Sequence, residues 1–131
     1  MDRPLVGRSI LIVEDEPLIA MDIRREFEAA GALVVLKRSL QSALVAVDDD
    51  APSAAILDHA LGNDDSSSLC ERLKERDIPF VVHSGCSNLE GACSAGVAVG
   101  KPNHPQLLVT TVVGLLRSQP ISSVHVPSQP Q

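Results

Sequence analysis

Short apolar runs recur along the chain, and longer segments with a one-sided apolar pattern separate them. The runs are Ile10–Val13, Leu33–Leu36, Ala54–Leu57, Phe80–His83 and Val97–Val99. Continuous apolar runs of this length are typical of strands that are buried on both faces of a parallel sheet. The pattern therefore predicts five strands, of which Ile10–Val13 is expected to be buried on both faces.

The segments between these runs have the spacing and the end residues of helices. Ile19, Ile23 and Phe27 recur every four residues in a helix that we expect to begin at Pro17 and to end at Gly31. Three more helices are predicted: one capped by Ser39 with Leu40, Ala43, Leu44 and Val47 on one face, one with Leu69 and Leu73 inward, and one from Pro105 to Leu116. Helices therefore follow four of the five strands.

Three connecting segments carry expectations of their own. Asp48–Asp50 should lie in an exposed turn that ends the second helix, which we favour over a metal site formed by the three aspartates. His59–Ser66 is predicted to be a polar loop. Residues 85–96 contain three glycines, so any helix between Leu89 and Ala95 should be short and weak.

The order of these elements is strand then helix, repeated along a single domain. Such an order predicts a parallel sheet with helices on both faces. Right-handed crossovers then favour an α/β, doubly wound, five-stranded parallel sheet of the flavodoxin-like (βα)5 kind. We assign residues 1–118 to this domain and residues 119–131, which are rich in Pro, Ser and Gln, to a C-terminal tail.

Composition and charge mainly exclude classes of partner, namely nucleic acids and membranes. The net charge of −6 and the presence of only two aromatic residues, Phe27 and Phe80, argue against a nucleic-acid partner. No apolar run approaches the roughly 20 residues that span a bilayer, and the N-terminus does not resemble a signal peptide. We therefore expect a cytoplasmic protein with no membrane partner. Cys70, Cys86 and Cys93 match no zinc or redox spacing and are expected to be free thiols.

Polar side chains stand directly after four of the predicted strands. They are Glu14 and Asp15, Asp58, Ser84 and Lys101. Because ligands bind beyond the carboxyl ends of parallel strands, these side chains should gather at one edge of the sheet. Clustered carboxylates favour a hard cation such as Mg²⁺, and a carboxylate can also act as a nucleophile toward phosphorus. The set predicts a phosphoryl-transfer site in which Asp58 is the acceptor.

The same positions resemble the signature of the receiver domains of two-component response regulators. The matching segments are Val13–Glu16, Leu57–Asp58, His83–Gly85 and Lys101–Pro102, within a resemblance that covers about residues 8–117. The resemblance implies a single-domain response regulator that accepts a phosphoryl group from a sensor histidine kinase or a histidine phosphotransfer protein and then acts on a downstream protein target. It also implies that the chain is not an enzyme, apart from catalysing its own phosphorylation and dephosphorylation.

The resemblance assigns a role to each residue of the set. Asp58 would be the phosphoacceptor, Ser84 the switch hydroxyl and Lys101 the contact to the phosphate. Glu14, Asp15 and Asp58 would hold Mg²⁺ together with the backbone carbonyl of Ala60. The chain departs from the family at Ala98, where an aromatic switch residue is frequent, so the usual aromatic relay cannot operate.

Other interpretations remain open at this point. The chain is alternatively a degenerate receiver that binds a protein without phosphorylation, or a phosphohydrolase with an aspartyl nucleophile. Ala60 argues against the hydrolase, because many such enzymes carry a second aspartate at that position. The last helix is apolar over most of its surface, so we expect a homodimer through it, with the tail folding back over the helix as the rival. His83 is expected to be a packed residue, on the opposite face from Ser84.

Overall fold

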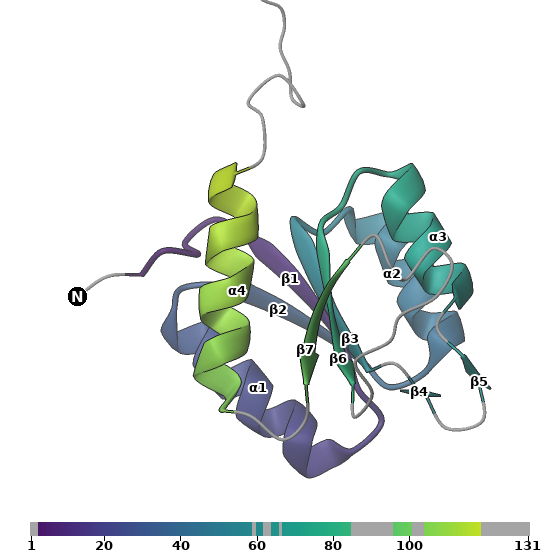
Figure 1. The fold of residues 1–131 in the computed structure, drawn as a ribbon, viewed down its shortest axis with the longest axis horizontal. Helices are drawn as coiled ribbons and strands as arrows, with labels where there is room; N and C mark the ends of the chain where they lie inside the picture. Colours follow the sequence, from purple (N-terminus) through teal and green to yellow (C-terminus); the bar gives the residue numbers. More distant parts are fainter. Residues whose placement is uncertain are drawn as a thin grey trace, which may run out of the picture.

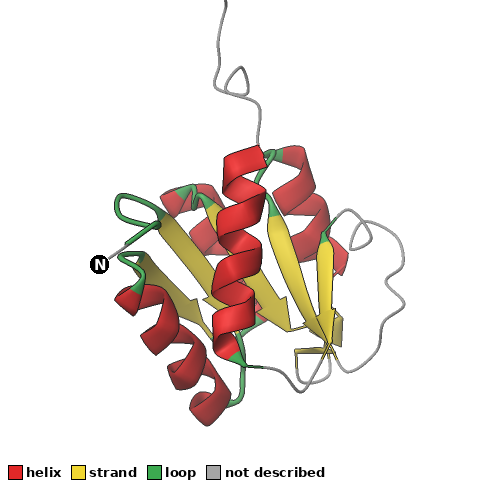
Figure 2. Cartoon of the chain, turned by 60° about the vertical axis from the view of Figure 1, so that its left-hand side comes forward, coloured by secondary structure: helices red, strands yellow, loops and turns green. Residues whose placement is uncertain are grey.

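The computed structural model describes residues 3–58, 60–61, 64–65, 67–84, 96–100 and 104–118. Five parallel strands form one sheet in the order β2-β1-β3-β6-β7, and Figure 2 shows their arrowheads pointing to the same edge. The strands are β1 (Ser9–Val13), β2 (Leu33–Lys37), β3 (Ala54–Asp58), β6 (Phe80–Ser84) and β7 (Val97–Gly100). The predicted doubly wound parallel sheet is confirmed.

In the described part of the chain, four helices cover the two faces of this sheet (Figure 1). They are α1 (Pro17–Ala29), α2 (Leu40–Asp50), α3 (Ser67–Glu75) and α4 (Pro105–Ser118). The α1 and α4 helices pack on one face, and α2 and α3 pack on the other. The central strands β1, β3 and β6 therefore contribute alternate residues to two separate cores, which explains their continuous apolar runs.

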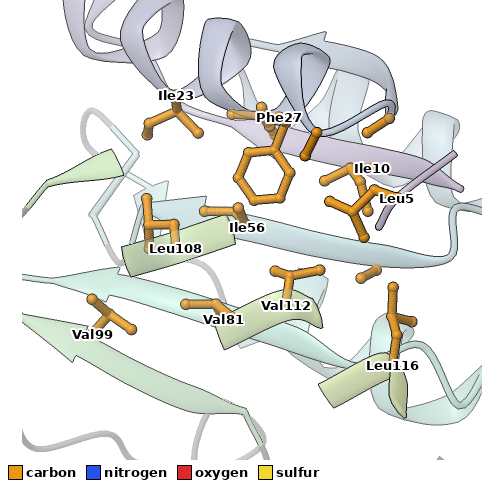
Figure 3. Packing of buried hydrophobic residues seen from close by; sticks show 14 residues of the cluster. Leu5, Ile10, Ile23, Phe27, Ile56, Val81, Val99, Leu108, Val112 and Leu116 are labelled. Carbon is orange, nitrogen blue, oxygen red and sulfur yellow. The ribbon is translucent and has the colours of Figure 1, made fainter. Parts of the chain in front are cut away.

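The core beneath α1 and α4 is centred on Phe27 (Figure 3). Its other large members are aliphatic, and they come from α1, from the sheet, from α4 and from the segment before β1. They are Leu5, Ile10, Ile12, Ile23, Ile56, Val81, Leu108, Val112 and Leu116. The second core takes the alternate strand residues Leu11, Val13, Leu57 and Val82 together with Leu69 and Leu73, whose inward direction is confirmed.

The α2 helix begins as predicted but ends later than predicted. The hydroxyl of Ser39 accepts a hydrogen bond from the backbone N–H of Ser42 at 3.2 Å, so Ser39 is the N-cap. The turn expected at Asp48–Asp50 is wrong, because these residues form the last turn of α2 and the chain leaves the helix at Ala51 in a left-handed conformation (φ 44°). Acidic residues are unfavourable at a helix C-terminus, and a positively charged partner offsets this cost for Asp48.

That partner is a pair of arginines at the end of α3. A carboxylate oxygen of Asp48 lies 2.6 Å from the guanidinium of Arg72, and the other lies 2.7 Å from that of Arg76. The hydrogen bond from Arg72 holds the pKa of Asp48 below its ordinary value, and the Asp48 carboxylate in turn raises the pKa of Arg72. These exposed ion pairs link α2 to α3 across the second core.

Replacing Asp48 by asparagine should lower the melting temperature at pH 7, because the ion pairs stabilise the charged form of Asp48 in the folded state only. Since the folded pKa is depressed, this stabilisation is complete above the unfolded pKa of about 3.9 and is lost as the pH falls through the lower folded value. Thermal denaturation followed by circular dichroism at pH 7 and near pH 2 to 3 measures the difference. The control variant Asp49→Asn should show no loss, and an equal loss in both variants would contradict the assignment.

The segment predicted to be a polar loop at His59–Ser66 contains two short strands. Ala60–Leu61 (β4) pairs antiparallel with Asp64–Asp65 (β5), so the loop prediction is wrong for these residues. Two-residue strands are too short to show an alternating apolar pattern. The available signal is the Gly-Asn pair at residues 62–63, a sequence that is typical of two-residue hairpin connections.

The one cysteine among the described residues, Cys70, differs from expectation. Cys70 on α3 is buried and disulfide-bonded, so the prediction of a free thiol is wrong for this residue. Sequence spacing gives no information about which cysteines approach one another in the fold. Cys86, Cys93, the weak helix expected between Leu89 and Ala95, and the tail all lie outside the described residues.

The last helix is only partly buried. Leu108, Val112 and Leu116 pack into the core, whereas Leu107 is exposed and Val109, Val113 and Leu115 are half-buried. Apolar surface therefore remains on α4, and the homodimer through this helix stays a prediction. Among the described residues, no helix is both long enough and apolar enough to cross a membrane.

Candidate functional site

Three carboxylates meet at the carboxyl edge of the sheet. Glu14 and Asp15 directly follow β1, and Asp58 is the last residue of β3, the neighbouring strand. One carboxylate oxygen from each residue lies within 4.8 Å of the others. The structure thus brings together the three acidic residues that the sequence predicted to share one site.

Backbone contacts fix the position of Glu14. Its N–H donates a 3.0 Å hydrogen bond to the carbonyl of Lys37, which extends the β1–β2 pairing by one residue. Its carboxylate oxygen Oε2 accepts a 3.1 Å hydrogen bond from the N–H of Glu16, immediately before α1. The helix N-terminus carries partial positive charge, so it stabilises a carboxylate at this position.

The cluster concentrates negative charge in a largely buried place. Glu14 is 2% exposed and Asp58 is 9% exposed, while Asp15 is half-buried. Neighbouring carboxylates disfavour one another's ionised forms, and burial adds to this cost. A hard divalent cation removes the repulsion, and an all-oxygen donor set is the kind that Mg²⁺ prefers. The residues present therefore fit a Mg²⁺ site.

The remaining predicted site residues lie on the same edge or beyond the described part. Ser84 is the last residue of β6 and stands in register with Gly100, the last residue of β7. The backbone of Ala60 lies in β4, directly after the connection from β3. The side chain of Ser84 and the whole of Lys101 fall outside the described residues. The roles of Ser84, Ala60 and Lys101 stay predictions.

His83 is closer to the site than sequence alternation indicated. It is buried, at 6% exposed, which agrees with the expected packed role. It also stands in register with Asp58 on the adjacent strand, so the two residues belong to the same face of the sheet. The sequence could not give this pairing, because the register between strands depends on the folded sheet and not on either strand alone.

The chain resembles part of several curated proteins, although no family model matches it. It is 32% identical over 97 residues to the Regulator of RpoS of Escherichia coli K12 and, with the same values, of Shigella flexneri. The aligned stretch covers 72% of this chain and 29% of each relative. The chain thus spans less than a third of the length of these curated relatives.

Solved structures of receiver domains superpose closely on this fold. A CheY-like response regulator receiver domain protein from Methanospirillum hungatei has a TM-score of 0.75 at 22% identity, over 84% of this chain and 94% of the other. The receiver domain of the Francisella response regulator 1452 has a TM-score of 0.72 at 21% identity, over 86% and 99%. The response regulator PhyR from Brucella abortus has a TM-score of 0.73 at 25% identity, over 88% of this chain and 50% of that protein. The chain therefore has the fold of response-regulator receiver domains, and three carboxylates meet at the carboxyl edge of its sheet.

Proposed function

We propose that this receiver domain accepts a phosphoryl group on Asp58, in the presence of Mg²⁺, from a sensor histidine kinase or a histidine phosphotransfer protein. The observation that supports the proposal best is the approach of Glu14, Asp15 and Asp58 to within 4.8 Å at the carboxyl edge of a parallel sheet. The domain then acts on a downstream protein target, and it has no activity beyond its own phosphorylation and dephosphorylation.

Asp58 is the best placed of the three carboxylates to act as the nucleophile. It ends β3, the middle strand of the sheet, between β1 and β6. Glu14 instead accepts a hydrogen bond from the Glu16 N–H, which reduces its availability to attack phosphorus. In the transfer, a carboxylate oxygen of Asp58 forms a bond to phosphorus while the phosphorus–nitrogen bond of the donor phosphohistidine breaks, and the released imidazole takes up a proton.

The metal would be held by the carboxylates of Glu14, Asp15 and Asp58 and by the backbone carbonyl of Ala60. When bound, Mg²⁺ supplies positive charge that offsets the charge of the carboxylates and of the phosphoryl oxygens. Ser84 would donate its hydroxyl proton to a phosphoryl oxygen, and Lys101 would pair with the phosphoryl group. These roles follow from the order of the strand ends and from the family resemblance.

Exposed apolar residues near the acidic edge support a protein partner there. Leu18 is 73% exposed and Met21 is 56% exposed in the first two turns of α1. Leu107, in the first turn of α4, is 48% exposed. Both helices begin at the carboxyl edge, where the cluster lies, and they pack beside each other (Figure 1). A phosphodonor that docks over these side chains would reach Asp58.

Incubation with acetyl phosphate tests the proposal without a known kinase. The intact chain should gain the mass of one phosphoryl group in the presence of Mg²⁺ and not in the presence of EDTA, as measured by mass spectrometry. The Asp58→Asn variant should gain nothing, while the control Asp50→Asn, at the exposed end of α2, should behave as the unmodified sequence does. Equal phosphorylation of the Asp58→Asn variant would reject Asp58 as the acceptor.

A further inference from the structure

A recess lies at the opposite end of the molecule from the acidic cluster. It has a volume of about 460 Å³ and lies between the segment before β1 and the second half of α4. Its lining residues are Arg3, Pro4, Val109, Thr110, Val113 and Arg117, and we call it the arginine groove. In Figure 1 the N-terminal segment, in purple, meets the upper half of α4 at this place.

One wall of the arginine groove is formed by α4, and the other is formed by the segment before β1. Val109, Val113 and Arg117 recur every four residues, so they share one face of α4. The opposite wall is held in place by Leu5, which is buried and whose N–H donates a 2.9 Å hydrogen bond to the carbonyl of Ala30. This anchor keeps the preceding Arg3 and Pro4 beside the helix.

The charge of the arginine groove is opposite to that of the chain as a whole. The chain carries a net charge of −6, yet the described residues that line the groove include two arginines and no acidic residue. Within the described part of the chain, no carboxylate forms an ion pair with Arg3 or Arg117. Two guanidinium groups that flank an apolar floor favour a ligand with both carboxylate and apolar groups.

The groove is separate from the acidic cluster. The α4 helix begins at the carboxyl edge of the sheet and runs back toward the amino edge, so its second half lies away from Asp58. Val113 stands eight residues after Pro105, which corresponds to about 12 Å along the helix axis. A ligand in the groove and a phosphoryl group on Asp58 therefore occupy different places on the domain.

We propose that the arginine groove binds an acidic peptide segment of a partner protein. An apolar side chain of the peptide would pack on Val109 and Val113, and carboxylates before and after it would pair with Arg3 and Arg117. The Thr110 hydroxyl donates its proton to the Gln106 carbonyl at 3.1 Å, so its oxygen remains able to accept a hydrogen bond from a peptide N–H.

The size, exposure and charge of the groove all favour this occupant. Its volume falls in the range of about 300–1,000 Å³ that is usual for ligand sites. Arg3, Pro4, Thr110 and Arg117 are all exposed, so an extended segment can enter from the surface. The chain's own tail offers no acidic side chain, because residues 119–131 contain neither Asp nor Glu.

Fluorescence anisotropy with the full-length chain tests this proposal. The probe is a fluorescein-labelled octapeptide of alternating leucine and glutamate. We expect the full-length chain to bind this peptide. Arg117→Glu and Arg117→Gln should both weaken the binding, because each removes a charge-assisted contact. The charge reversal should raise the dissociation constant by about tenfold or more. The control Arg38→Glu makes the same change in net charge at an exposed position after β2, and it should leave binding unchanged. Amide chemical shifts in NMR spectra should change around Val109, Thr110, Val113 and Arg117.

Several results would overturn the proposal. Equal weakening by Arg117→Glu and Arg38→Glu, or equal binding of a polyglutamate peptide, would show that the peptide binds by general charge attraction and not in the groove. Absence of binding would reject the site. Binding that appears only when Ile121, Val124 and Val126 are changed to serine in the full-length chain would assign the groove to the tail. A dimer in light scattering that Arg117→Glu converts to a monomer would assign it to a second copy of the chain.

Discussion

Replacement of Asp15 by asparagine should slow the phosphorylation of Asp58 by acetyl phosphate by about 100-fold or more. Asp15 follows β1, and its carboxylate lies within 4.8 Å of those of Glu14 and Asp58. Loss of a group that positions charge in a phosphoryl-transfer site costs about two to three orders of magnitude in rate. The rate of appearance of the phosphorylated mass at saturating Mg²⁺ measures the effect.

The Asp15→Asn variant should also differ from the unmodified chain in how Mg²⁺ changes its thermal stability. Without metal, removing one of three neighbouring charges relieves repulsion, so the variant should melt at a higher temperature than the unmodified chain. With Mg²⁺ at ten times its dissociation constant, the unmodified chain should gain about 1.4 kcal/mol, and the variant should gain much less. The control Asp22→Asn, on the exposed surface of α1, should keep the full Mg²⁺ response. An Asp15→Asn variant with a normal rate and a normal Mg²⁺ response would remove Asp15 from the site.

Replacement of Phe27 by alanine should lower the free energy of unfolding by about 3–5 kcal/mol, which is the usual range for a buried aromatic residue. Phe27 is completely buried, and it lies between the sheet residues Ile10 and Ile56 and the helix α4 (Figure 3). The other residues around it are aliphatic, so no second aromatic ring of this core can fill the space. A loss of this size is a large fraction of the stability of a small domain.

Urea denaturation followed by circular dichroism measures this loss. Leu18→Ala is the matched control, because it removes a large apolar side chain from the same helix at a position that is 73% exposed. The control should change the free energy of unfolding by less than about 0.5 kcal/mol. A Phe27→Ala variant that unfolds at the same urea concentration as the control would show that this core does not hold α1 and α4 on the sheet.

The elements of the fold that could be predicted are those whose physical cause is local. A strand buried on both faces must be apolar at every position, so Ile10–Val13 and Ala54–Leu57 were recognisable without any knowledge of their partners. The three carboxylates could be predicted to meet because parallel strands end at one edge, whatever their order in the sheet. Neither inference depends on distances between particular side chains.

The features that could not be predicted depend on pairs of residues far apart in the sequence. The last turn of α2 carries the ion pairs from Asp48 to Arg72 and Arg76, and these contacts exist only when α3 is in place. The register of His83 with Asp58 and the disulfide of Cys70 are of the same kind. The arginine groove likewise arises from the meeting of the first and last described segments.

The position of β1 in the sheet has a consequence for the order in which a ribosome delivers the chain. The β1 strand is synthesised before the other strands of the sheet, and it lies between β2 and β3. One of its edges therefore has no strand to pair with until Ala54–Asp58 has been synthesised. Glu14 and Asp15 acquire Asp58 as a neighbour in that same event. The cluster of three carboxylates should thus form only after the third long strand has emerged and docked.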